Sequence, residues 1–210
     1  SVLNFSGWGT GGTTVYQNEG IYLAYCYSVT VSNNKVINCR YPLHIYNSDN
    51  IVISGNYLNN GYSYTSATNP VLYIEGTSAS NIGMFTITGN IFYQHYVFGS
   101  SYSSTTSSIV KITANGGFGG TINSNLFALD SSVLATYLAY SMLDVAAKDY
   151  TITGNTFYAK LLYIIIAIVP VPVINVTGIN CLVSLNNVQD IYMATTVSKI
   201  NVGTTGNVDF

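Results

Sequence analysis

Charged side chains are scarce in this chain. Lys and Arg together number six and Asp and Glu eight among 210 residues, so 7% of the residues are charged and the formal net charge is −2. An average domain has about a quarter of its residues charged. Without a basic surface, the protein has little electrostatic attraction for nucleic acid or for an anionic membrane. We therefore expect neither nucleic-acid binding nor membrane insertion.

The chain also lacks a long hydrophobic run and the cysteine spacing of a metal site. Its strongest apolar run, residues 161–169, is much shorter than the roughly 20 residues of a transmembrane helix. Cys26, Cys39 and Cys181 form no CxxC or Cys/His pattern, so we expect no metal and no cofactor. Two interpretations remain for these cysteines: a Cys26–Cys39 disulfide outside the cell, or three buried thiols.

The chain does contain a repeated pattern: apolar, any, apolar, small polar, Gly or Asn, Asn, any, apolar. The alternating apolar residues predict a strand with one buried face. The next position accepts positive φ, which allows a sharp turn, and the following Asn lies on that turn. The pattern recurs six times, the last time with one residue missing, and its asparagines are Asn34, Asn56, Asn90, Asn125, Asn155 and Asn186.

A second predicted strand precedes each of these turns by roughly ten to sixteen residues and has an apolar, polar, apolar triplet. Two columns with the same phase indicate stacked coils with at least two strands each. In coils about 4.8 Å apart, the asparagine amides would bond to one another as a ladder. We therefore predict an all-β fold, a right-handed parallel β-helix (a solenoid) of about seven coils. The alternative, an antiparallel sandwich or barrel, does not explain the asparagine column.

The recurring text I-x-I-x-G-N-x-F, as in the repeat that ends at Phe92, resembles the pectate-lyase-like right-handed parallel β-helix superfamily, which includes viral tailspikes. The resemblance covers roughly residues 20–205 and specifies fold better than function. We expect an N-terminal extension or cap contact in residues 1–20, the β-helix in 21–205 and a C-terminal tail in 206–210. The composition, poor in charge and rich in Tyr, Ser, Thr and Asn, resembles surface proteins of acidophilic archaea and their viruses.

The middle residue of each triplet should point outward. In enzymes of the resembled superfamily, catalytic groups usually lie on one outer sheet face, so Glu75, Lys111 and Asp144 are the catalytic candidates, a carboxylate pair and a Lys acting on a glycan or uronate. We favour the alternative, a surface ion-pair ladder with Lys111 between the two acids. His44 is expected to be an isolated polar surface residue. The predicted outward column is Tyr22, His44, Tyr73, Lys111, Asp144, Asn175 and Asn201.

The longest insertions follow the asparagine turns at residues 59–70, 93–108 and 128–141. Because they occupy equivalent places in successive coils, they should emerge on one side. Their aromatic rings suit the faces of sugars, but equally suit packing on the solenoid or on a second subunit. The candidate ligand-binding residues are Tyr62, Tyr64, Tyr93, His95, Tyr96, Tyr102, Tyr137 and Tyr140.

The segment 161–169 is apolar at nearly every position. A coil strand buries only alternate residues, so half of this segment should face outward and be covered by a second chain or by a loop of its own chain. The first alternative makes Tyr163, Ile164, Ile165 and Ile166 an oligomer interface.

These observations favour a non-enzymatic surface protein, extracellular or on a virion. Scarce carboxylates speak against catalysis, and the open ends of a β-helix need a cover. We expect a tail-spike, receptor-binding (host-attachment) or structural protein with a possible glycan ligand. It should be a homo-oligomer, with a trimer favoured, or part of a larger spike assembly. The alternatives are a polysaccharide lyase or glycoside hydrolase acting on an outer sheet face, and a filament or coat subunit.

Overall fold

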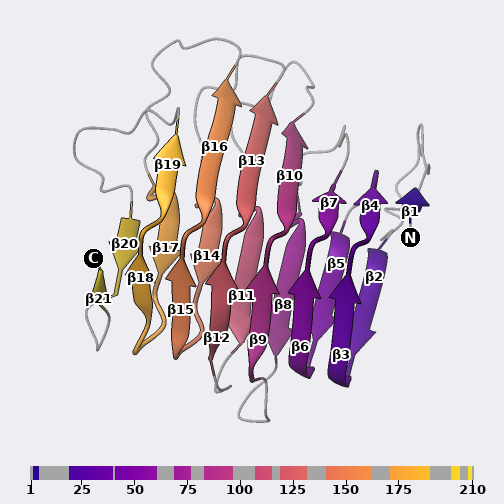
Figure 1. Cartoon of the computed structure of the whole chain (residues 1–210), viewed down its shortest axis with the longest axis horizontal. Helices are drawn as coiled ribbons and strands as arrows, with labels where there is room; N and C mark the ends of the chain where they lie inside the picture. Colours follow the sequence, from indigo (N-terminus) through magenta and orange to yellow (C-terminus); the bar gives the residue numbers. More distant parts are fainter. Residues whose placement is uncertain are drawn as a thin grey trace, which may run out of the picture.

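The computed structural model contains only strands, joined by turns and loops, in the part of the chain that it describes (Figure 1). That part comprises residues 2–4, 19–39, 41–60, 69–76, 83–96, 107–114, 119–131, 141–161, 171–189, 200–203 and 208–209.

The strands form three parallel sheets of seven strands each, named here A, B and C. Sheet A consists of β1 (Val2–Asn4), β4 (Lys35–Ile37), β7 (Tyr57–Asn59), β10 (Ile91–Tyr96), β13 (Leu126–Ser131), β16 (Thr156–Leu161) and β19 (Asn187–Gln189). Sheet B consists of β2 (Glu19–Ala24), β5 (Tyr41–Tyr46), β8 (Leu72–Gly76), β11 (Val110–Ala114), β14 (Leu143–Val145), β17 (Ile174–Val176) and β20 (Ile200–Val202). Sheet C consists of β3 (Tyr27–Ser32), β6 (Asp49–Ser54), β9 (Phe85–Thr88), β12 (Gly120–Asn123), β15 (Tyr150–Thr153), β18 (Leu182–Ser184) and β21 (Val208–Asp209).

The chain visits the sheets in the fixed order A, B, C, so each strand pairs with the strands three places before and after it. In Figure 1 the strands of each sheet lie side by side along the long axis, from β1, β2 and β3 at one end to β19, β20 and β21 at the other. Every pairing between described strands is parallel, as in β5 with β8 or β12 with β15. This arrangement is compatible with a parallel β-helix, and the antiparallel sandwich or barrel is wrong.

Parallel pairing extends beyond the expected bounds of 21–205. Strand β1 pairs with β4, and β21 pairs with β18, so the expected extension and tail each contribute a strand. Sheet A was predicted only through single apolar residues after the turns. Four of its seven strands, β1, β4, β7 and β19, have only three residues, which carry too little alternation to be recognised by period alone.

The interior is built from side chains that repeat in register from coil to coil. In sheet A, Phe92, Phe127 and Phe157 are aligned and fully buried. Their neighbouring ring centroids lie 5.2 Å and 4.5 Å apart. In sheet C, Gly120 lies opposite Phe85, and a Cβ on Gly120 would approach the Phe85 carbonyl oxygen to 2.2 Å. The glycine is therefore required where the other coils carry a side chain.

Thiols occur in this interior without a disulfide. Cys39 and Cys181 are buried and free, and Cys26 is free and half-buried. Burial raises the pKa of Cys39 to about 12, and it also raises that of Cys181. The structure has no Cys26–Cys39 disulfide, so the expectation of free thiols is the correct one. Cys26, however, is only half-buried.

The predicted asparagines form a hydrogen-bonded ladder along the turns between sheets C and A. The Asn90 side-chain oxygen accepts from both the backbone N–H and the Nδ2 of Asn56, each at 2.9 Å. The Asn90 amide nitrogens repeat this on the oxygen of Asn125, at 2.9 and 3.0 Å. The same pair of bonds joins Asn34 to Asn56, Asn125 to Asn155, and Asn155 to Asn186. Each buried amide is therefore satisfied mainly by its neighbours in the stack.

The residue before each ladder asparagine has a left-handed backbone. This requirement explains the Gly or Asn of the repeat, since these residues adopt positive φ most easily. Two coils depart from the rule and place Ser or Leu there. The six residues and their φ angles are Asn33 at 54°, Gly55 at 64°, Gly89 at 64°, Ser124 at 54°, Gly154 at 65° and Leu185 at 54°.

We predict that Asn155→Leu destabilises the fold by about 1–3 kcal/mol, the usual cost of stranding buried polar partners. Asn155 is 0% exposed, and its Nδ2 donates both to the Ile122 carbonyl and to Asn186 Oδ1. The matched control is Asn187→Leu, because Asn187 is an exposed asparagine on the adjacent strand β19. Urea unfolding measures both, and equal small losses would mean that the ladder contributes no stability.

Candidate functional site

The outer face of sheet B carries the predicted outward column. Strand register aligns Tyr22, His44, Tyr73, Lys111, Asp144, Asn175 and Asn201 in one row. None of these side chains is buried, whereas the flanking apolar residues of the central triplets are fully buried. The row runs the length of sheet B.

The three catalytic candidates do not form one constellation. Lys111 aligns with Asp144, but Glu75 lies in the next row, opposite Tyr46 and Thr113. Glu75 bonds to His44, and Asp144 accepts from Asn175 Nδ2 at 3.0 Å. In the described part of the chain Lys111 forms no ion pair with Glu75 or Asp144, so the expected ladder with Lys111 between two acids is wrong. Each acid instead finds a hydrogen-bond donor of its own.

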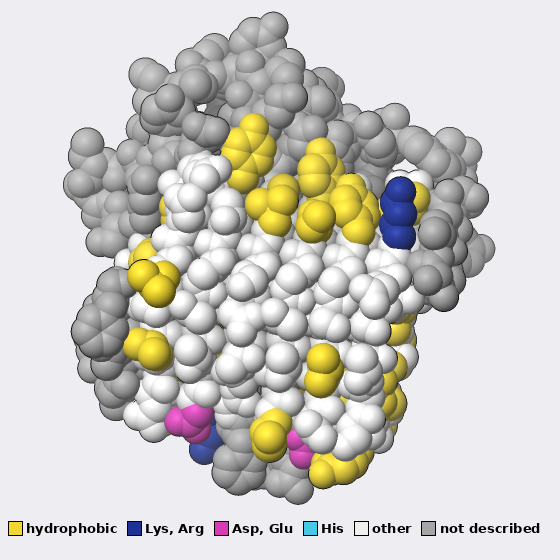
Figure 2. Space-filling view, in the orientation of Figure 1, with side chains coloured by type: hydrophobic (Ala, Val, Ile, Leu, Met, Phe, Trp, Pro, Cys, Tyr) yellow, Lys and Arg dark blue, Asp and Glu magenta, His cyan; other side chains and the backbone are white. Residues whose placement is uncertain are grey.

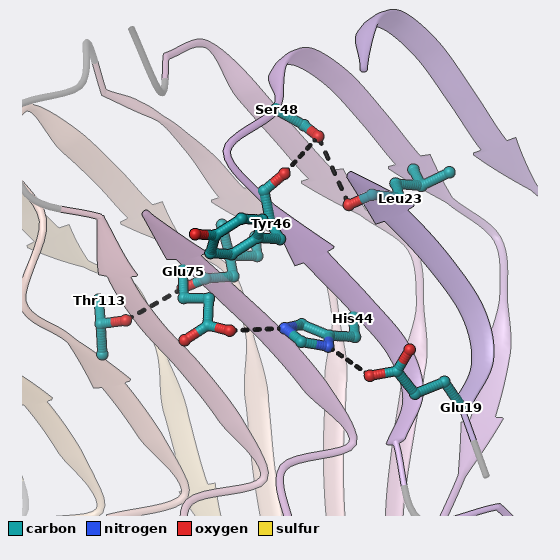
Figure 3. A network of polar contacts seen from close by, with 8 residues as sticks. Glu19, Leu23, His44, Tyr46, Ser48, Glu75 and Thr113 are labelled. Atoms are coloured by element: carbon teal, nitrogen blue, oxygen red, sulfur yellow. Dashed lines mark hydrogen bonds and ion pairs between the residues drawn. The ribbon is translucent and has the colours of Figure 1, made fainter. Parts of the chain in front are cut away.

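His44 is the centre of a polar cluster, not an isolated surface residue as predicted. Its Nδ1 lies 2.7 Å from Glu19 Oε1 and its Nε2 lies 2.9 Å from Glu75 Oε1, as Figure 3 shows. Its side chain is only 12% exposed. An ionised carboxylate can only accept, so both contacts are satisfied when both ring nitrogens carry a hydrogen. His44 thus joins three strands, β2, β5 and β8, through side chains alone.

Aromatic rings surround this cluster. The His44 ring stacks on Tyr73, with centroids 5.3 Å apart and planes at 15°, and its centroid lies 5.0 Å from that of Tyr22 and 5.5 Å from that of Tyr41. Tyr41 also stacks on Tyr73 at 6.3 Å. Burial and then the neighbouring Glu75 raise the pKa of Tyr73, which keeps its phenol neutral. We call the six side chains Glu19, Tyr22, Tyr41, His44, Tyr73 and Glu75 the sheet B cluster.

Glu19 and Tyr41 belong to this cluster although the repeat did not predict them. Both lie two residues before the apolar start of their triplet, at Ile21 and Leu43, and the register pairs them with each other. By strict alternation each would share the buried face of that apolar residue and not the outer face of Tyr22 and His44. The pairing of β2 with β5 skips Gly20 and Pro42, so the alternation breaks there, which the triplets did not reveal.

The other half of the row is a second, shorter ladder of amides. Asn175 Nδ2 donates to Asp144 at 3.0 Å, and Asn201 Nδ2 donates to Asn175 Oδ1 at 2.7 Å. The outer face of sheet B therefore changes along the axis from aromatic and acidic to carboxamide, with Lys111 between the two parts.

Most of the candidate ligand-binding residues lie outside the described residues. Tyr93 is half-buried in β10, and its ring centroid lies 6.4 Å from that of Tyr57 in a stacked geometry. For His95 and Tyr96 only the place in β10 is described. Outside the described residues lie Tyr62, Tyr64, Tyr102, Tyr137 and Tyr140, and also the predicted oligomer interface of Tyr163, Ile164, Ile165 and Ile166.

Hydrophobic side chains do gather on the described outer face of sheet A. Figure 2 shows them over the strands of sheet A, above an outer face of sheet C that is mostly uncharged and polar. At the end of this strip the Lys35 Nζ lies 5.7 Å from the centre of the Tyr57 ring. The register and the buried phenylalanines place on this outer face Tyr57, Ile91, Tyr93, Leu126 and Tyr158.

No helix in the described ranges is long and apolar enough to cross a membrane. In the same ranges no three His, Cys, Asp or Glu side chains are grouped so that they could hold a metal ion. Comparison with protein-family models and with curated proteins found no match. The function is therefore inferred from the geometry of the sheet B cluster.

We predict that His44→Ala destabilises the protein by about 1–3 kcal/mol, because it removes two hydrogen bonds to charged groups and leaves two carboxylates facing each other. Lys111→Ala is the matched control in the same row and should change stability by less than about 0.5 kcal/mol. Chemical denaturation of both variants checks this. Equal effects would show that His44 does not hold strands β2, β5 and β8 together.

Proposed function

We propose that the chain is a right-handed parallel β-helix of about seven coils, of the pectate-lyase-like and tailspike kind, and that it is a non-enzymatic glycan-binding protein of a cell or virion surface. Host attachment, as a receptor-binding spike, is the role that this chemistry suits best. The observation that carries the proposal is the sheet B cluster, where stacked rings lie beside two carboxylates.

A sugar presents apolar C–H faces and a rim of hydroxyl groups. Exposed rings such as Tyr22, which is 50% exposed, offer a flat apolar surface to such a face at little cost in side-chain entropy. The carboxylates of Glu19 and Glu75 are 23% and 30% exposed, so each keeps accessible acceptor capacity beside its bond to His44. Rings and acceptors on one face of a rigid sheet form a preorganised surface for a neutral glycan.

The same contacts weigh against glycan cleavage. General acid and base catalysis by a carboxyl pair requires two environments that push their pKa values apart. Glu19 and Glu75 instead share one histidine, at 2.7 and 2.9 Å, and Asp144 is bonded to an amide. Carboxylates held in this way position neighbouring rings and strands.

Homo-oligomerisation, with a trimer favoured, is part of the proposal. The apolar strip on sheet A supports it, because Ile91 is 37% exposed and its neighbours are aromatic or aliphatic in a chain with few charges to protect them. Side-by-side contact through this strip would leave the sheet B cluster on a different face.

We predict that Tyr22→Ala weakens binding of a glycan by about two- to tenfold, since an aromatic contact contributes about 0.5–1.5 kcal/mol. A glycan array on the unaltered protein identifies the ligand, and titration calorimetry compares the variants. The control is Tyr27→Ala, which removes a 72% exposed ring on sheet C, outside the cluster. Absence of any array signal, or an equal loss in both variants, would rule out the sheet B cluster as the binding face.

We also predict no release of reducing ends from uronate or neutral polysaccharides. The check is a reducing-sugar assay with long incubation and high protein concentration. Activity that disappears in Glu75→Gln or Asp144→Asn, and persists in Lys148→Ala, would overturn the non-enzymatic assignment.

A further inference from the structure

The sheet B cluster carries more negative than positive charge. Glu19 and Glu75 lie at 2.7 and 2.9 Å from the two ring nitrogens of His44, so two carboxylates share at most one positive charge (Figure 3). In the described part of the chain neither acid is paired with a Lys or Arg. At least one negative charge of the cluster is therefore left for a ligand to neutralise.

The lysine of the adjoining strand does not neutralise this charge. Lys111 in β11 lies opposite Tyr73 in β8, and it forms no ion pair with Glu75. It adds a positive charge beside the cluster and leaves both carboxylates to His44 and to solvent. Lys111 should therefore weaken the attraction of the cluster for a cation without blocking it.

The phenols of the cluster respond to the excess negative charge. Burial is the largest cause that raises the pKa of Tyr22, and the charge of Glu19 is the next. Glu75 likewise adds to the effect of burial in raising the pKa of Tyr73. A field that holds a proton on two neighbouring phenols also favours a bound cation.

The aromatic rings offer this cation a second kind of contact. Tyr22 and Tyr73 flank His44 in the outward row, and the face of a tyrosine ring attracts an ammonium group. The protein already contains one such contact on sheet A, where Lys35 Nζ lies 5.7 Å from the centre of the Tyr57 ring. Among the described side chains, no ammonium group lies over Tyr22 or Tyr73.

These groups distinguish sugars by their charge. A protonated amine on a sugar has three N–H donors and a positive charge, so it can bond to a carboxylate of Glu19 or Glu75 while the sugar ring lies on Tyr22. A hydroxyl or an acetamide in the same place donates one hydrogen and brings no charge. A uronate carboxylate only accepts, and it would face two acids that also only accept.

We propose that the sheet B cluster selects glycans by charge: it prefers a sugar residue with a protonated amine to the same residue with a hydroxyl or an acetamide, and it rejects uronates. Neutral glycans still fit the rings, with lower affinity. This inference rests on the proposed glycan binding at this face and adds the class of sugar. Cation–π contact and an exposed ion pair together give a preference of about three- to thirtyfold.

The first test uses the unaltered protein on a glycan array. The array carries matched pairs of hexosamine glycans, each with its amine free or acetylated, together with uronate glycans. We expect the free-amine member of a pair to bind more strongly and the uronates to bind least. Titration calorimetry on the best pair then measures the ratio of the two affinities. That ratio should fall below about threefold in about 0.5 M NaCl, because salt screens exposed charges.

Charge variants assign this ratio to the cluster. Glu19→Gln and Glu75→Gln each keep an oxygen that accepts from His44 but lose the charge, so each should lower the ratio by about two- to fivefold. Lys111→Ala should raise it by up to about threefold, since it removes the neighbouring positive charge. The matched control is Asp49→Asn, which removes an acid from β6 of sheet C and should leave the ratio unchanged.

The outcomes separate this inference from the glycan-binding proposal. Equal binding of both members of each pair, or preferred binding of uronates, overturns selection by charge while glycan binding stands. A preference for the amine that neither Gln variant lowers would place the selection outside the cluster and also overturn the inference. If the Gln variants fail to fold, Lys111→Ala decides, and an unchanged or lower ratio contradicts the inference. Absence of signal from every glycan would rule out both.

Discussion

The fold depends on one constraint: every coil must present the same side chain at the same place as the coils on either side of it. A single coil cannot bury its inner face, so it is stable only when its neighbours supply the other half of each contact. Two sets of side chains meet this constraint. The phenylalanine stack of sheet A does so with apolar contacts, and the asparagine ladder does so with hydrogen bonds. A residue that breaks register harms two interfaces at once, which is why Gly120 is retained beside Phe85.

Low charge follows from the same constraint. Parallel strands place identical positions about 4.8 Å apart, so a charged residue repeated in each coil would repel its neighbours. Hydroxyls and amides can instead bond along the stack, as Asn201, Asn175 and Asp144 do on sheet B. Where two acids lie on either side of one coil, at Glu19 in β2 and Glu75 in β8, the coil between them supplies His44. The low content of charged residues is therefore explained by the stacking of parallel coils as much as by the surroundings of the protein.

Much of the architecture could be predicted from sequence because stacking repeats its own signals. The asparagines at 22, 34, 35, 30 and 31 residues from one another and the apolar triplets both mark register directly. The sheet B cluster could not be predicted in the same way. Glu19 and Glu75 are 25 and 31 residues from His44, and Glu19 lies beside it only because the alternation of β2 breaks between Glu19 and Ile21, which no repeat encodes. Strands as short as β1 and β21 also leave too few alternating residues for recognition.

The variable spacing of the ladder has a consequence for how such a surface can evolve. Successive coils close over 22 to 35 residues and still deliver their asparagine to the same bond. The closure entropy of a flexible loop depends only logarithmically on its length, so this range costs about 0.4 kcal/mol. Strands β7, β10 and β13 end beside one another in sheet A, each where a long connection to sheet B begins. Sequence there can be lengthened, shortened or exchanged while the scaffold keeps its register, which makes that margin a site for rapid diversification and for grafting foreign peptides.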